Sequence, residues 1–286
     1  MAKTILVTGA TGTVGGDVLR GLAGRTDVQV RAAVRDKEKS AALAGPNVEL
    51  VWFDYTMPET LGVASRGADA AFMVPPLSPD CVAEGIEFLT AAREAGVKHV
   101  VKLSVIRSLG DSTVGKWHAA IDEALKKSGM AWTLLLPGGF MQNLVEGSAP
   151  RPDGNLYLPV GNAKSAYIDT RDIAAVAVKA LTEPGHEGKE YTLTGPEDLS
   201  YAEMAAIMTE ASGRQIRHID VPPEAARQGM LAAHMPEWMV DIILEINAWA
   251  KASKGGEITT TVKDIIGRPA RTFREFARDY ADHWKA

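Results

Sequence analysis

The sequence contains a single cysteine, Cys81, among its 286 residues. One cysteine excludes a disulfide framework and any metal cluster that is built from cysteine ligands. Cys81 lies between Asp80 and Val82 at the expected start of a helix. This setting favours a small packing residue over a nucleophile, and we expect no bound metal.

Long apolar runs and an excess of basic residues are also missing. No run is long enough to span a bilayer and there is no charged-then-apolar leader, so we expect a cytoplasmic protein without a membrane contact. The formal net charge is −5, and we therefore expect no binding of nucleic acid. The 46% of hydrophobic and 23% of charged residues are typical of a globular enzyme with a large core.

The most informative segment is the glycine-rich stretch near residue 10. An apolar run over residues 4–7 breaks into Gly9, Gly12 and Gly15 and then resumes with helical spacing. In a dinucleotide-binding turn the first glycine permits a tight turn, the second a close approach to pyrophosphate, and the third helix packing. The spacing is G-x-x-G-x-x-G, and a tight strand-to-helix turn without a ligand is the alternative. We assign to the cofactor Gly9, Thr11, Gly12, Thr13, Val14 and Gly15.

Arg35 lies where a Rossmann fold reads the adenosine ribose. It closes the apolar run 28–34 and follows Gly15 by 20 residues, which is the difference between 35 and 15. An acidic residue there would bind the ribose hydroxyls of NAD, whereas the arginine fork suits the 2′-phosphate of NADP. Arg35 therefore favours NADP. Lys37 and Lys39 either support this preference or are solvated surface charges. Asp36 lies one position later and is able to bind the ribose hydroxyls of NAD, so NAD stays an alternative cofactor.

Strand and helix patterns alternate up to about residue 140. This order predicts a Rossmann-type α/β fold with a doubly wound parallel sheet, in which ligands bind at the carboxyl ends of the strands. Asp54 follows the third strand and either contacts the adenine or caps the next turn. From the loops at this edge we assign to the cofactor Asp54, Tyr55, Val74, Pro75, Pro76, Ser104, Pro137, Gly138, Gly139 and Phe140.

The pattern changes beyond Pro137, where helices no longer alternate strictly with strands. We predict a Rossmann domain over residues 1–140 with part of 160–195, and a smaller C-terminal α/β substrate lobe over 141–286. Asp169 and Asp172 are interpreted as helix caps and partners of Arg171. The segment 222–250 is rich in methionine and tryptophan, and most of these side chains are expected in the core. The alternative is that some line a pocket or form a homodimer contact.

Several short motifs together resemble the NmrA-like family of atypical short-chain dehydrogenases/reductases. Besides the glycine turn they are Val34-Arg35, Phe53-Asp54, Lys102-Leu103-Ser104, Trp117-His118, residues 125–129, Trp132-Thr133, residues 137–143 and residues 266–273. Within the family the chain is similar to NADPH-dependent quinone reductases and to reductases of triphenylmethane and azo dyes. The resemblance covers about residues 4–280. It implies a Rossmann domain, a smaller C-terminal lobe and a substrate cleft between them.

The chain departs from typical dehydrogenases in its acid/base residues. None of its six tyrosines is followed four residues later by the lysine that would lower the pKa of the tyrosine. His118 stands near the expected start of a helix, where the related isoflavone-reductase-like enzymes carry a lysine. We therefore name His118 as the candidate catalytic residue, with a packing role as the alternative. Lys116 and Ser104 are weaker candidates.

These observations predict an NAD(P)H-dependent reductase of a small aromatic, quinone-like or dye-like acceptor. Such an acceptor delocalises the charge that arrives with the hydride, so the protein mainly orients the reactants and excludes water. The predicted substrate contacts are Phe140, Asn143, Met235 and Trp238. Two alternatives stay open, namely an NADP-binding sensor that acts through a protein partner and a reductase of imines, enones or sugar-like carbonyls.

Overall fold

The computed structural model describes residues 2–252 and 256–285, and the chain divides into two compact units. The first comprises Met1–Ile106, Lys116–Pro137 and Thr170–Thr192. The second comprises Arg107–Gly115, Gly138–Asp169 and Leu193–Ala286.

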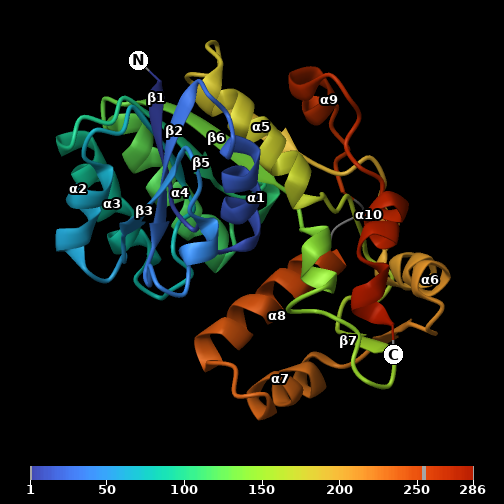
Figure 1. Ribbon diagram of the computed structural model, residues 1–286. Helices are drawn as coiled ribbons and strands as arrows, with labels where there is room; N and C mark the ends of the chain where they lie inside the picture. The colour runs from blue at the N-terminus through green and yellow to red at the C-terminus, as the bar shows by residue number, and fades with distance from the viewer. Residues whose placement is uncertain (1, 253–255, 286) are drawn as a thin grey trace. The chain divides into compact units, whose positions relative to one another are not determined.

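A seven-stranded sheet forms the centre of the first unit (Figure 1). In spatial order its strands are β3 (Val48–Trp52), β2 (Val28–Val34), β1 (Lys3–Val7), β4 (Ala70–Met73), β5 (His99–Leu103), β6 (Ala131–Pro137) and β9 (Lys189–Leu193). The pairs from β3 to β6 are parallel. The order 3-2-1-4-5-6 is that of a Rossmann fold, and the direction of winding reverses between β1 and β4. The predicted fold class is therefore confirmed.

Helices cover both faces of this sheet. Figure 1 shows α1 (Thr13–Leu22) and α5 (Thr170–Thr182) on one face, with α2 (Pro58–Ser65) and α3 (Cys81–Glu94) on the other. The helix α4 (Thr113–Lys127) packs with α2 and α3, since Ile121 and Leu125 share one buried cluster with Leu61 and Phe88. The central strands β1, β4, β5 and β6 are mostly buried, which explains why they are nearly continuous apolar runs.

Cys81 begins α3 and is buried in that same cluster. Burial raises the pKa of its thiol to about 11. The thiol therefore stays protonated at neutral pH, and Cys81 is a packing residue as predicted.

The second unit contains two small sheets and several helices. The strands β7 (Asn155–Leu158) and β11 (Arg217–Asp220) pair in parallel, and β8 (Lys164–Ser165) pairs antiparallel with β10 (Leu199–Ser200). Its helices are α6 (Tyr201–Ser212), α7 (Pro223–Ala232), α8 (Glu237–Ala252), α9 (Thr261–Ile266) and α10 (Phe273–Asp279). Met204, Met208, Phe273, Phe276 and Trp284 form its core. None of the helices in the described part of the chain is long and apolar enough to cross a membrane.

The methionine- and tryptophan-rich segment is less buried than its composition suggests. Of the eight side chains on which the expectation of a core rested, only Ile242 is buried. The others are Met230, Met235, Trp238, Met239, Ile243, Leu244 and Trp249, and each of them is partly exposed. The prediction that most of them are core residues is wrong, because α7 buries no side chain and α8 buries only Val240 and Ile242.

His99, at the start of β5, predicts a dependence of stability on pH. Burial lowers the pKa of His99 to about 4. The Thr133 hydroxyl donates to the His186 carbonyl at 2.7 Å, so it accepts from His99 Nε2–H at 2.9 Å, a bond that the neutral ring is able to make. The folded pKa is lower than the unfolded one, so the contribution is complete above about pH 6.5 and is lost as pH falls toward 4. We expect a loss of about 3 kcal/mol in total, with roughly 2 kcal/mol gone by pH 5.

Urea unfolding of wild type and of His99→Asn at pH 7 and pH 5 measures this effect. The asparagine amide can donate to Thr133 and does not titrate. The wild type should therefore lose more stability than the variant between the two pH values. Equal losses would show that His99 is not responsible.

Candidate functional site

The glycine turn lies between β1 and α1, where the winding of the sheet reverses. The structure explains the presence of glycine differently at each of its three positions. Gly9 has a φ of +63°, which favours glycine. At Gly15 a Cβ would lie 2.1 Å from the Gly9 carbonyl oxygen, inside the backbone of the turn. Gly12 has extended backbone that any residue adopts, and its nearest obstacle to a Cβ is the Gly9 oxygen at 3.3 Å.

Gly12 is thus the glycine that the fold itself explains least. It is exposed and is the N-cap residue of α1, whose first turn contains no acidic side chain. An open helix N-terminus with a small residue in front of it fits a phosphate group. Thr11 is also exposed, whereas the Val14 side chain is buried, so Val14 is able to reach a ligand only through its backbone. The turn therefore fits the pyrophosphate of a dinucleotide.

Hydrogen bonds connect the glycine turn to the loops after β3 and β4. The backbone N–H of Val74 donates to the Thr8 hydroxyl oxygen at 2.8 Å. The Tyr55 hydroxyl donates to the Val74 carbonyl at 2.8 Å, and burial raises the pKa of Tyr55, so this donor stays protonated. The backbone of Gly9 packs closely on the Val74 side chain. Three of the predicted cofactor residues are thereby brought together, and Pro75 and Pro76 follow them directly.

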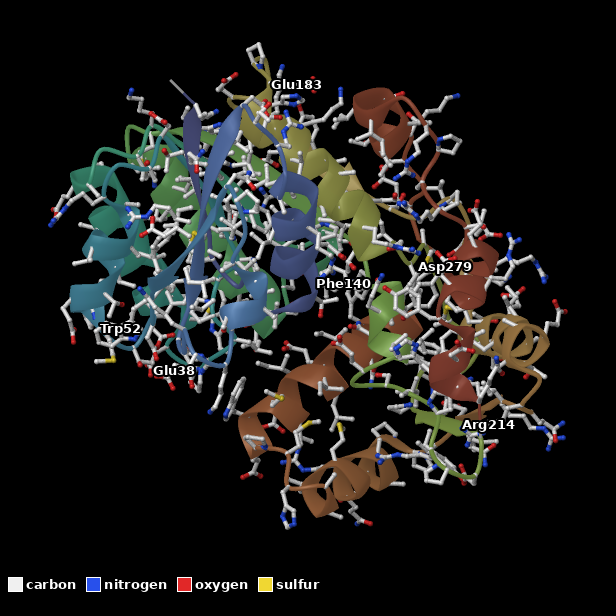
Figure 2. The ribbon with its side chains drawn as sticks, in the orientation of Figure 1. Glu38, Trp52, Phe140, Glu183, Arg214 and Asp279 are labelled. Atoms are coloured by element: carbon white, nitrogen blue, oxygen red, sulfur yellow. The ribbon has the colours of Figure 1, made fainter. Side chains whose placement is uncertain are left out.

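Arg35 follows β2 at the carboxyl edge of the sheet. It is exposed and forms no hydrogen bond or ion pair with any described residue. The strands β2 and β3 end beside each other at the paired residues Val34 and Trp52. Figure 2 shows Trp52 and Glu38 at this edge. The guanidinium of Arg35 is thus available to an anionic ligand.

The acidic neighbours of this edge are engaged by the backbone. Asp36 accepts from the backbone N–H groups of Glu38 and Lys39, and it lies 3.4 Å from the Lys39 ammonium. Asp54 accepts from the backbone and hydroxyl of Thr56 at 3.0 and 2.8 Å. Asp54 therefore caps the following turn, and its contact with adenine stays a prediction.

Four side chains form a buried polar network behind the end of β5. The ammonium of Lys102 donates to Asp122 Oδ1 at 2.8 Å and to His118 Nδ1 at 3.1 Å. Ser104 Oγ donates to Asp122 Oδ2 at 2.8 Å. Lys102, Asp122 and Ser104 are almost fully buried, whereas His118 is partly exposed. The network thus joins the candidate catalytic residue to a buried ion pair.

One expectation about this region needs correction. Helix α4 begins at Thr113, so His118 lies in its second turn rather than near its start; the Ser112 hydroxyl caps Gly115 and marks the earlier start. The hydroxyl of Ser104 is directed to Asp122, and its contact with the cofactor stays a prediction. Lys116 is exposed.

Lys102 and Asp122 were not predicted as site residues from the sequence. A lysine inside the apolar strand 99–103 is unusual, because a charged side chain is rarely fully buried without a partner. Asp122 lies four residues after His118, which places both on one face of a helix. These two signals together indicate the network.

The segment after β6 belongs to the second unit. Phe140 forms a parallel bridge with Ile168, and Figure 2 shows it just before the 3-10 turn η3 (Met141–Leu144). The Tyr167 ring occupies the place that a Gly139 side chain would need, at 2.6 Å from the Cβ position. Gly138 donates its N–H to the Leu193 carbonyl. Pro137 is buried at the end of β6.

The predicted substrate residues are accessible. Asn143 is exposed, and its side-chain amide has no partner among the described residues. Met235 is partly exposed in the turn between α7 and α8, and Trp238 is partly exposed in the first turn of α8. No group of three or more His, Cys, Asp or Glu residues in the described part of the chain is placed to hold a metal ion.

The model of the NmrA-like family matches residues 1–276. The chain belongs to the NmrA-like family. The NAD(P)H azoreductase of Xenophilus azovorans is 44% identical over 280 residues, which cover 97% of this chain and 98% of that protein. The predicted resemblance is therefore confirmed.

Solved structures of similar fold cover nearly the whole chain. The NADPH-dependent quinone oxidoreductase QOR2 of Escherichia coli, in complex with NADPH, has a TM-score of 0.83 at 25% identity, covering 96% of this chain and 98% of that one. Triphenylmethane reductase of Citrobacter sp. has a TM-score of 0.84 at 24% identity, covering 99% of this chain and all of that one. The second likeness concerns the fold alone.

Proposed function

We propose that this chain is an NADPH-dependent oxidoreductase that reduces quinones or conjugated dyes such as azo compounds. The observation that carries the proposal is the full-length similarity to an NAD(P)H azoreductase. The NADPH complex of the similar quinone oxidoreductase structure supports the cofactor. The open glycine turn and the unpartnered Arg35 fit that cofactor. The cytoplasmic location and the homodimer stay predictions, as do the domain boundaries.

The residues that would hold NADPH come from the edge of the sheet. The backbone at Gly12 and the start of α1 would bind the pyrophosphate, and Arg35 would bind the 2′-phosphate. The loop at Val74–Pro76 and residues 137–140 would position the nicotinamide. When bound, NADPH supplies a hydride. Asn143, Met235 and Trp238 would hold the acceptor and exclude water from it.

The acceptor class follows from the residues that are missing. Ordinary ketone reduction needs a general acid near the carbonyl oxygen. In typical dehydrogenases this acid is a tyrosine followed four residues later by a lysine, and no tyrosine of this chain has that partner. A quinone or azo acceptor spreads the incoming charge over several atoms and takes its proton from water or a weak acid. His118 would assist this step by donating a hydrogen bond to the acceptor or to the nicotinamide ribose.

Steady-state oxidation of NADPH with a quinone and with an azo dye tests the proposal. We expect continuous turnover with at least one of them and a lower rate with NADH. A chain that binds NADPH but oxidises none of it with these acceptors would instead be a sensor, and the proposed activity would be wrong.

Replacement of His118 by alanine should have a limited effect. We expect turnover of a quinone to fall at most roughly a hundredfold, because water is able to protonate the delocalised product. Single-turnover measurements with NADPH and its deuterated form would separate hydride transfer from later steps. A loss of many thousandfold would identify His118 as an obligatory acid and would move the substrate class toward simple carbonyls or imines.

A further inference from the structure

The buried network beside His118 consists of groups whose donors and acceptors are fixed by their chemistry. A lysine ammonium has three donors and no acceptor, so the contact of Lys102 Nζ with His118 Nδ1 at 3.1 Å requires Nδ1 to accept. An imidazole whose Nδ1 accepts is neutral and has its proton on Nε2.

Asp122 holds the Lys102 ammonium in its charged form. Both residues are almost fully buried, and the Nζ to Oδ1 distance is 2.8 Å. The second carboxylate oxygen accepts from Ser104, so both oxygens are bonded. A buried lysine without this partner would lose its proton, and it would then no longer be a donor-only group.

An ion pair buried at this depth adds little to stability compared with an apolar pair of similar size. Its position, next to a partly exposed histidine at the carboxyl edge of β5, is where functional groups collect in this fold. Packing alone therefore does not explain why an ion pair is buried here.

We propose that Lys102 and Asp122 are positioning residues that fix His118 as a neutral hydrogen-bond donor through Nε2. His118 then stabilises the negative charge that develops on an oxygen or nitrogen of the acceptor, without giving up its proton. The inference rests on the proposed function for the identity of this acceptor. It narrows the substrate class to electron-poor compounds that have a hydrogen-bond-accepting atom in conjugation with the reduced centre, as in quinones and azo compounds.

The ¹⁵N spectrum of the His118 ring tests the tautomer in the protein without cofactor, and His118→Ala assigns the signals. We expect the wild type to show one neutral ring with its proton on Nε2 at the assay pH. The double variant Lys102→Met/Asp122→Asn removes both charges of the ion pair together; there we expect a mixture of tautomers. A wild-type ring protonated on Nδ1 or on both nitrogens, or an unchanged tautomer in the double variant, would overturn the inference.

A glutamine at position 118 separates a donor from an acid. The carbonyl of glutamine can accept from Lys102 while its amide donates, but glutamine cannot transfer a proton as an acid. We expect His118→Gln to turn over quinone at least about tenfold faster than His118→Ala, as one restored hydrogen bond would allow. Equal rates in the two variants would contradict the donor role.

A double-mutant cycle tests whether Lys102 acts through His118. In the Lys102→Met/Asp122→Asn background, replacement of His118 by alanine should cost less than half, on a logarithmic scale, of its cost in the wild type. Equal costs would overturn the coupling. Circular dichroism and NADPH fluorescence titration control for folding and cofactor binding. A wild type that turns over neither quinone nor dye would refute the proposed function, whereas the tautomer measurement would stand on its own.

Discussion

Replacement of Gly12 by valine is expected to abolish NADPH binding in a chain that still folds. The backbone of Gly12 is extended, so valine fits its conformation, and the residue is exposed at the N-terminus of α1. The branched side chain would stand where phosphate oxygens approach the backbone. We expect at least about a hundredfold weaker binding, which corresponds to the loss of two charge-assisted hydrogen bonds of about 1.5–3 kcal/mol each.

Two neighbouring glycines provide matched controls for this variant. A Cβ at Gly16 would meet its nearest atom at 3.4 Å, so Gly16→Ala should keep both folding and binding. Gly15→Ala should instead damage the fold, because its Cβ would lie 2.1 Å from the Gly9 oxygen. Circular dichroism and titration of NADPH fluorescence distinguish the three variants. Normal binding by folded Gly12→Val would show that no phosphate approaches this turn.

Replacement of Arg35 by alanine should remove the preference for NADPH. The exposed guanidinium has no partner in the described protein, so the main loss should be its charge-assisted contact with the 2′-phosphate. A loss of about 1.5–3 kcal/mol raises the Michaelis constant for NADPH by roughly ten- to 150-fold. The constant for NADH should change little.

Arg35→Lys and Lys37→Ala refine this test. Lysine keeps the charge but not the planar fork, so it should recover only part of the affinity. Lys37 is exposed two residues further along, and its removal should have a small effect. A wild type that already prefers NADH would refute the assignment of Arg35.

The parts of the site that sequence patterns predicted are those fixed within a few residues of the chain. The turn from Gly9 to Gly15 and the placement of Arg35 after a strand depend on local backbone chemistry, and the structure has both where they were expected. The ribose and phosphate contacts themselves stay predictions.

The parts that were missed depend on contacts between distant elements. The network of Lys102 and Asp122 joins β5 to α4, and no local pattern states that these two elements meet there. The partly exposed Trp238 shows a second limit. An apolar side chain indicates that burial is favourable, but it does not show whether the helix has a packing partner on that side.

The burial of Cys81 has a consequence for the proposed reduction of quinones. Quinones are electrophiles that add to thiolates, and a thiol with a pKa of about 11 in the core of α2, α3 and α4 is almost never ionised or accessible at neutral pH. Because Cys81 is the only cysteine of the chain, substrate should not inactivate the protein by arylating a thiol. The same property would permit a single cysteine introduced at the surface to be labelled selectively.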